Sequence, residues 1–158
     1  MVVALAALGF WALRVLFPSD ETVIRKLLAQ MAAAASLKPN ENALVKLAGA
    51  NKLAGFFTAD AVIRIDVTGG RTRTIHGREE LIEIVTAARA NLQEVKIQLH
   101  DIVVELAPDR QTALAQLTAL ANIDGSTDPI FQLLKIRLKK IDGHWRISQV
   151  DTVKTPGV

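Results

Sequence analysis

The chain of 158 residues lacks two residue types altogether, cysteine and tyrosine. Without cysteine it has no disulfide, no thiolate metal site, no iron–sulfur cluster and no thiol nucleophile. Aromatic residues make up only 4% of the chain, so few side chains are available to stack on nucleic-acid bases. The formal net charge is +3, an excess too weak to indicate a polyanion-binding protein. These shortages exclude thiol chemistry and argue against a nucleic-acid partner.

Apolar residues, in contrast, are half of the total, and 22% of the residues are charged. Such a balance is typical of a folded protein and excludes general disorder. The length suffices for one compact domain. Apolar residues recur mostly at helical spacing in the first part of the chain and alternate in the second, so we expect an α+β fold.

Residues 2–17 form a continuous apolar run, interrupted only by Gly9 and Arg14. A helix over this run would be about 24 Å long, slightly short of the roughly 30 Å hydrocarbon core of a bilayer. Local thinning, with Arg14 reaching the headgroups and Phe17 near the interface, would compensate for the difference. We therefore predict a single-pass membrane anchor over residues 1–18, with a folded domain over residues 19–158 on the extracytoplasmic (periplasmic) side.

Two other interpretations of this run stay open. A cleaved secretory signal would normally have a basic residue before the apolar run and a small-x-small site after it, and neither is present. A buried core helix would normally show a polar face, which this run lacks. The lack of preceding basic residues is also consistent with a natural start upstream of Met1, and it leaves the membrane orientation weakly determined.

After Pro18 the hydrophobic periodicity predicts helices first and strands last. Helices are expected over about 20–35, 41–54 and 78–92, the first of them capped by Ser19 or Asp20. Strands are expected over about 60–67, 71–76, 94–106, 111–123, 130–141 and 144–153. In the strand over 94–106 the apolar positions change from odd to even across His100-Asp101, and a β-bulge there would restore all of them to one face. Alternatively, the two halves of this strand face different layers.

Three short sequence phrases follow one another in the order typical of a known superfamily. They are the helix-to-strand entry FFTADAVIRID, the strand–glycine–helix junction IHGREEL and the final hairpin IDGHWRI. Over about residues 20–153 the chain resembles the nuclear transport factor 2-like superfamily, which includes SnoaL-like proteins with a cystatin-like fold. The resemblance implies a strongly curved, mostly antiparallel sheet of about six strands, wrapped over about three helices as a cone with a cavity. Members of this superfamily often form homodimers through the open sheet face, and we expect the same here.

The resemblance also implies isomerase or dehydratase chemistry, for which two catalytic candidates exist. Asp66 is the candidate base of an isomerase, although it lies about one residue out of register and the tyrosine donor of the steroid-isomerase relatives is missing. His100, re-aimed by the bulge, is the candidate of a dehydratase. Each of them has an ordinary surface or structural role as its alternative. For ligand binding the candidates are His76, Trp145 and Asp151, and Trp145 alternatively fills the core.

Motifs for other chemistry are missing from the sequence. No histidine pair has the spacing of metal ligands, and the glycine-rich phosphate loops and the serine nucleophile elbow are absent, so we expect no metal and no cofactor. Lys135, Arg137 and Lys139 alternate along one strand, with Arg146 on its hairpin partner. This row either binds anionic headgroups or an acidic partner, or is a solvated sheet face.

Together these features favour a membrane-anchored, non-catalytic binding or assembly domain, with a cone-shaped pocket for a partner protein or an apolar ligand. The alternative is a small-molecule isomerase, dehydratase or cyclase of SnoaL-like type that uses Asp66 or His100 in the cone. The sequence leaves the identity of the ligand or partner open.

Overall fold

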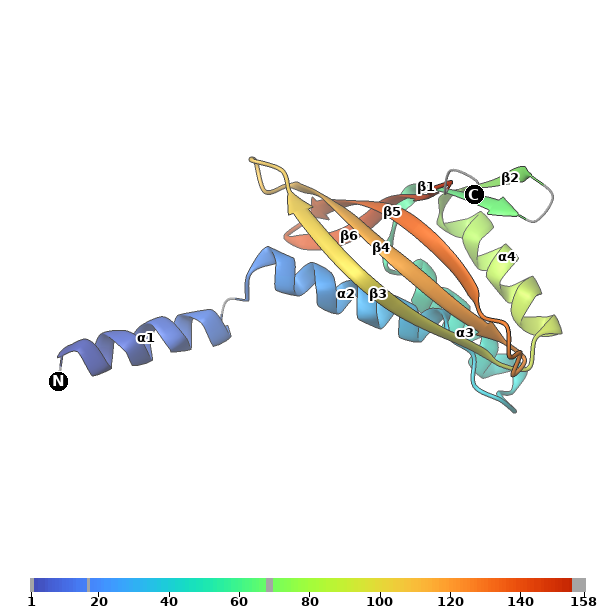
Figure 1. Cartoon of the computed structure of the whole chain (residues 1–158), viewed down its shortest axis with the longest axis horizontal. Helices are drawn as coiled ribbons and strands as arrows, with labels where there is room; N and C mark the ends of the chain where they lie inside the picture. Colours follow the sequence, from blue (N-terminus) through green and yellow to red (C-terminus); the bar gives the residue numbers. More distant parts are fainter. Residues whose placement is uncertain (1, 17, 68–69, 155–158) are drawn as a thin grey trace.

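The computed structural model of the chain describes residues 2–16, 18–67 and 70–154 (Figure 1). Its helices are α1 (Val2–Leu16), α2 (Asp20–Ala35), α3 (Ala43–Ala54) and α4 (Gly77–Asn91). Its strands are β1 (Phe57–Val67), β2 (Arg71–His76), β3 (Val95–Leu106), β4 (Thr112–Ile123), β5 (Ile130–Ile141) and β6 (His144–Thr152). The elements expected after Pro18 are therefore present, close to their expected bounds.

The strands form one mixed sheet in the order β2-β1-β6-β5-β4-β3. Strands β1 and β6 are parallel, and the other neighbours are antiparallel. Helix α2 packs against β3 and β6, α4 packs against β1 and β2, and α3 packs against both helices (Figure 1). We call the helix-covered side of the sheet the inner face and the opposite side the outer face. The predicted α+β architecture, a six-stranded sheet over helices, is confirmed.

Apolar side chains fill the space between α2 and the inner face. Ile24 and Leu28 lie one helical turn apart on α2 and belong to the same buried cluster as Ile136, Leu138 and Ile147 of the sheet. All five are at most 1% exposed. Burying a side chain of this size contributes about 1.5–3 kcal/mol to the free energy of folding. The core therefore lies between α2 and the inner face, on the side of the sheet where the resemblance implied a cavity.

The predicted β-bulge in β3 is confirmed. The pairing of β3 with β4 shifts between His100 and Val103, and Asp101 has a left-handed backbone with a φ of 53°. Because the extra residue changes the phase of the strand, Leu99 before it and Ile102 after it both pack against the core. The alternative, in which the two halves of β3 face different layers, is excluded.

The predicted membrane anchor, by contrast, is wrong. Helix α1 has only 15 residues and ends at Leu16, and no helix among the described residues is both long and apolar enough to cross a membrane. The physical reason is length, because a helix of 15 residues extends only about 22 Å, against the roughly 30 Å of a bilayer's hydrocarbon core. The assignment to a single-pass membrane protein depended on this anchor and is therefore also wrong. Phe17 and the side chain of Arg14 lie outside the described residues, and the domain division at residue 18 stays a prediction.

Helix α1 projects away from the rest of the chain in Figure 1. Large apolar side chains on it are exposed, among them Val3 at 82% and Trp11 at 67%. The interpretation of this segment as a buried core helix is therefore also wrong, because the helix does not join the hydrophobic core.

Two cations tie the helices together at their C-terminal ends, where free carbonyl groups carry partial negative charge. Arg89 of α4 is only 4% exposed, and its Nη2 donates to the carbonyl oxygens of Ala34 and Ser36 at the end of α2. Lys46 of α3 in turn donates to the Arg89 carbonyl at 2.9 Å. Gly49 leaves room for this arrangement, because a Cβ there would overlap the Arg89 guanidinium.

We predict that Gly49→Ala destabilises the fold by about 1–2 kcal/mol, because the added methyl group displaces the Arg89 guanidinium from the α2 carbonyls. In an Arg89→Met background the same change should be neutral or stabilising by up to about 1 kcal/mol, since alanine favours helix over glycine. Urea unfolding of the members of this double-mutant cycle measures both values. If Gly49→Ala changed the free energy of unfolding equally in the two backgrounds, the contact between Gly49 and Arg89 would be contradicted.

Candidate binding surface

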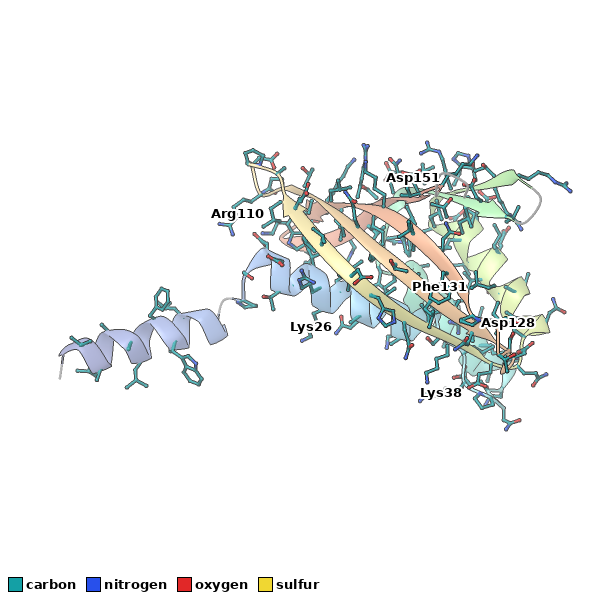
Figure 2. The ribbon with its side chains drawn as sticks, in the orientation of Figure 1. Lys26, Lys38, Arg110, Asp128, Phe131 and Asp151 are labelled. Carbon is teal, nitrogen blue, oxygen red and sulfur yellow. The ribbon has the colours of Figure 1, made fainter. Side chains whose placement is uncertain are left out.

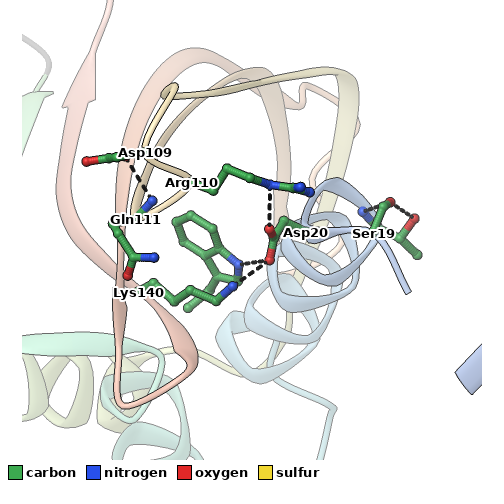
Figure 3. Close-up of polar contacts among 8 residues, drawn as sticks. Ser19, Asp20, Asp109, Arg110, Gln111 and Lys140 are labelled. Atoms are coloured by element: carbon green, nitrogen blue, oxygen red, sulfur yellow. Dashed lines mark hydrogen bonds and ion pairs between the residues drawn. The ribbon is translucent and has the colours of Figure 1, made fainter. Parts of the chain in front are cut away.

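A carboxylate at the start of α2 joins the helix to the sheet (Figure 3). Ser19 is the N-cap of α2, which leaves the side chain of Asp20 free to reach the strands. Asp20 Oδ1 accepts hydrogen bonds from Lys140 Nζ at 2.9 Å and from Trp145 Nε1 at 3.1 Å. Asp20 Oδ2 lies 3.4 Å from Arg110 Nε in the β3–β4 turn. One carboxylate thus fixes the helix, the β5–β6 hairpin and the β3–β4 turn relative to one another.

These contacts set the charge state of Asp20 and the environment of Trp145. The hydrogen bond from Lys140, followed by that from Trp145, lowers the pKa of Asp20 below its ordinary value of 3.8. Trp145 is 2% exposed and packs in the core, with Lys140 Nζ 5.5 Å from its ring centre. The structure therefore places this candidate ligand-binding residue in the core, with its indole N–H already satisfied. Sequence reasoning missed the role of Asp20 because it assigned the residue to capping.

The two candidate catalytic residues lie on the outer face. Asp66 shares its side of β1 with Arg64, whose Nη1 contacts Asp151 Oδ1 at 2.9 Å. The hydrogen bond from Thr72 Oγ1, at 2.6 Å, is the main cause that lowers the pKa of Asp66. A general base working near neutral pH needs the opposite shift. His100 is exposed on β3, directly before the bulge.

The remaining candidate site residues do not form a common site with Asp66 and His100. His76 and His100 lie at opposite edges of the sheet, because β2 and β3 are the terminal strands of the strand order. The backbone N–H of His76 donates to Glu80 Oε2 at 2.6 Å, where β2 leads into α4. Asp151 is held by its ion pair with Arg64. Among the described residues, no group of three or more His, Asp or Glu side chains is arranged to hold a metal ion. The predicted site residues thus lie apart, and their functional roles stay predictions.

The outer face carries a row of cations near the β5–β6 hairpin, which we call the basic row. Lys135, Arg137 and Lys139 alternate along β5, and Arg146 of β6 lies directly opposite Lys139. The ion pairs found among the described residues involve none of these four side chains. Like charges directly opposite one another on neighbouring strands are destabilising. The pair of Lys139 and Arg146 therefore has a cost in stability, whereas Lys135 lies directly opposite Asp151, a residue of opposite charge.

A groove of about 460 Å³ lies beside the basic row. Part of its lining is Leu114 of β4, which has Glu105 of β3 and Arg137 of β5 as its cross-strand neighbours. Lys135 and Lys139 also line it. The sequence predicted the row of cations, but the groove depends on which strands are neighbours and was not predicted.

The other end of β5 carries exposed apolar side chains on the same face. Phe131 is 65% exposed and Leu133 is 41% exposed, and Val153, just after β6, is 42% exposed. Leu120 of β4 lies directly opposite Phe131. Figure 2 shows Phe131 near Asp128, at the end of the sheet away from Arg110. We call Leu120, Phe131, Leu133 and Val153 the apolar patch.

Comparison with protein families identifies the domain. The model of the SnoaL-like domain family matches residues 19–151, which is most of the chain. The chain belongs to this family. The match begins directly after Pro18 and ends within β6. Comparison with curated proteins finds no match.

Solved structures share the fold of this SnoaL-like domain at low sequence identity. A proposed aromatic ring hydroxylase from Novosphingobium aromaticivorans is 17% identical, with a TM-score of 0.66 over 84% of this chain and 87% of that one. A proposed scytalone dehydratase from the same organism is 11% identical, with a TM-score of 0.62 over 85% of each chain. A protein of unknown function with a cystatin-like fold, from Nostoc punctiforme, is 14% identical, with a TM-score of 0.62 over 88% of this chain and 93% of that one. Identities this low establish the cystatin-like fold alone.

We predict that Asp20→Asn lowers the free energy of unfolding at neutral pH by about 1–3 kcal/mol, because it weakens the hydrogen bonds that hold α2 to the sheet. The pKa of Asp20 is lower in the folded than in the unfolded chain, so the stabilisation by its charge is complete above the ordinary value of 3.8 and is lost as the pH falls through the folded pKa. The difference between the two proteins should therefore shrink below about pH 4.

Urea unfolding at neutral pH and at several acidic pH values measures this difference. Asp128→Asn is the matched control, because the carboxylate of Asp128 is exposed and only its backbone forms hydrogen bonds in the described structure. A difference between wild type and Asp20→Asn that stayed constant down to about pH 2 would show that the charge of Asp20 does not stabilise the fold.

Proposed function

We propose that the chain is a non-catalytic protein-binding domain whose binding surface is the outer face of the sheet. The apolar patch carries this proposal: it is exposed on a face that no described helix covers, and it lies next to unpaired cations. The inner face, in contrast, is filled by the side chains of the core. Contiguous apolar surface with a polar margin is typical of a protein interface.

The partner we propose for the apolar patch is a second copy of the chain. A two-fold contact through β4 and β5 would place Phe131 of each copy against the patch of the other. The patch itself contains no charged residue, so self-association brings no like charges together within it. The basic row begins only at Lys135, further along β5. The resemblance to a superfamily whose members often pair through the sheet face supports the same arrangement.

The enzymatic alternative receives less support from the geometry. An isomerase or dehydratase of this fold would need its acid or histidine to face the substrate inside the cone, whereas Asp66 and His100 lie on the outer face. The likeness to a proposed scytalone dehydratase extends to the fold and not to these residues. Shared folds of this kind carry many unrelated functions.

We predict that the wild-type chain is a dimer in solution and that Phe131→Asp shifts it to monomer, raising the dimer dissociation constant by about tenfold or more. The reason is that the substitution places a charge in the centre of a desolvated apolar contact. Sedimentation equilibrium over a range of protein concentrations measures this constant.

Leu44→Asp is the control, because Leu44 is also an exposed apolar residue, at 78%, but lies on α3 away from the outer face. The control should dimerise as the wild type does. A wild type that is monomeric at all concentrations, or a control that loses the dimer equally, would overturn the assignment of the outer face to self-association.

A further inference from the structure

We propose that the groove beside the basic row binds an extended acidic segment of a partner protein. This inference deepens the proposed function and rests on the outer face being a protein-binding surface. It concerns the hairpin end of β5, whereas the proposed self-association uses the apolar patch at the other end. The two contacts are therefore separable by mutation.

The charge of the groove determines the chemistry of its ligand. Lys135, Arg137 and Lys139 line it, and Glu105 is the single acidic residue among its lining side chains. Lys135 lies opposite Asp151 of β6, but the described structure forms no ion pair with any of the three cations. Lys139 lies directly opposite Arg146, so two like charges face each other across the hairpin. A bound carboxylate would relieve this repulsion and form charge-assisted hydrogen bonds with the cations.

The spacing of the groove favours a segment in extended conformation. Alternate residues of a strand lie about 6.8 Å apart, so the cations at 135, 137 and 139 repeat at this interval. An extended peptide with acidic residues at every second position presents carboxylates at the same interval. Leu114, which is partly buried in the groove beside Arg137, would contact the aliphatic parts of the acidic side chains, and the neutral residues between them would face away from the groove. A helical segment would present its acids in a different pattern.

The shape and lining of the groove argue against other anionic ligands. Lys135 is only partly exposed, and a planar bilayer surface reaches recessed cations poorly. Among the described residues that line the groove there is no aromatic side chain on which a nucleic-acid base could stack. Glu105 adds a local negative charge that would repel a uniformly charged polyanion but would be tolerated by a segment with neutral positions.

A peptide-binding experiment with the full chain tests this inference. The probe is a fluorescein-labelled peptide in which glutamate and threonine alternate, and the comparison peptide has the same composition with its glutamates adjacent. Fluorescence anisotropy at low salt should give the alternating peptide a dissociation constant lower by about fivefold or more. The affinity should fall at higher salt, because exposed charges are screened.

The variants Arg137→Glu and Lys139→Glu should each weaken binding of the alternating peptide by about tenfold. Lys38→Glu is the matched control, because it changes the charge by the same amount in an exposed loop remote from the groove (Figure 2). It should leave the affinity within about twofold of the wild type. Lys139→Glu should also raise the melting temperature, since it replaces the like-charged pair with Arg146 by an opposite-charged one. Loss of binding in that variant therefore cannot be ascribed to unfolding.

Equal affinity for the two peptides, or equal losses in the groove variants and in Lys38→Glu, would overturn the inference. The inference would also be overturned if the groove bound phosphatidylserine vesicles or oligothymidylate more tightly than the alternating peptide. Repeating the assay with Phe131→Asp separates this inference from the proposed dimer. If the monomeric variant still binds the peptide, the groove binds it without the second copy. If the variant loses binding, the groove requires the dimer, and the inference that the two contacts are separable is overturned.

Discussion

Helix α2 is held by charge at both of its ends, to the sheet at its start and to α4 at its end, and the remaining architecture depends on this attachment. At its start, the Asp20 carboxylate accepts hydrogen bonds from Lys140 and Trp145 of the β5–β6 hairpin. At its end, the Arg89 guanidinium of α4 binds the last carbonyl groups. Between these two points the apolar side chains of α2 pack into the inner face of the sheet. The helix thereby closes the inner face and leaves the outer face as the surface available for binding.

The bulge in β3 contributes to the same division between the two faces. Without the extra residue at Asp101, one half of β3 would turn its apolar side chains to the outer face, because a one-residue slip reverses the facing of a strand. With it, the inner face receives apolar residues of both halves, such as Leu99 and Ile102, and the outer face receives His100 and Glu105 together with the exposed Val103. The bulge thus accounts for the position of His100 on the outer face.

Local sequence patterns, namely hydrophobic periodicity and short family-like phrases, made most of the fold predictable. Alternation in β3 revealed the bulge, and the three phrases of the superfamily indicated the fold. The prediction of an anchor failed because hydropathy describes composition, whereas spanning a bilayer also requires a longer helix than the 15 residues of α1. The buried contacts of Arg89 were not predicted, because its neighbours Ala34 and Ser36 are 55 and 53 positions away in the sequence. Strand order was equally inaccessible, and it places His76 and His100 at opposite edges.

The position of β6 has a consequence for synthesis on the ribosome. This strand is the last of the described strands in the sequence, yet it lies in the sheet between β1 and β5, and its Asp151 binds Arg64, 87 positions earlier. Until β6 has emerged, no strand joins the β1–β2 hairpin to the meander of β3 to β5, and each piece presents an open strand edge. Open edges of this kind are templates for aggregation, and pairing across so long a sequence separation is slow. The sheet therefore closes only after β6 has emerged, and until then the nascent chain exposes strand edges of the kind that chaperones shield.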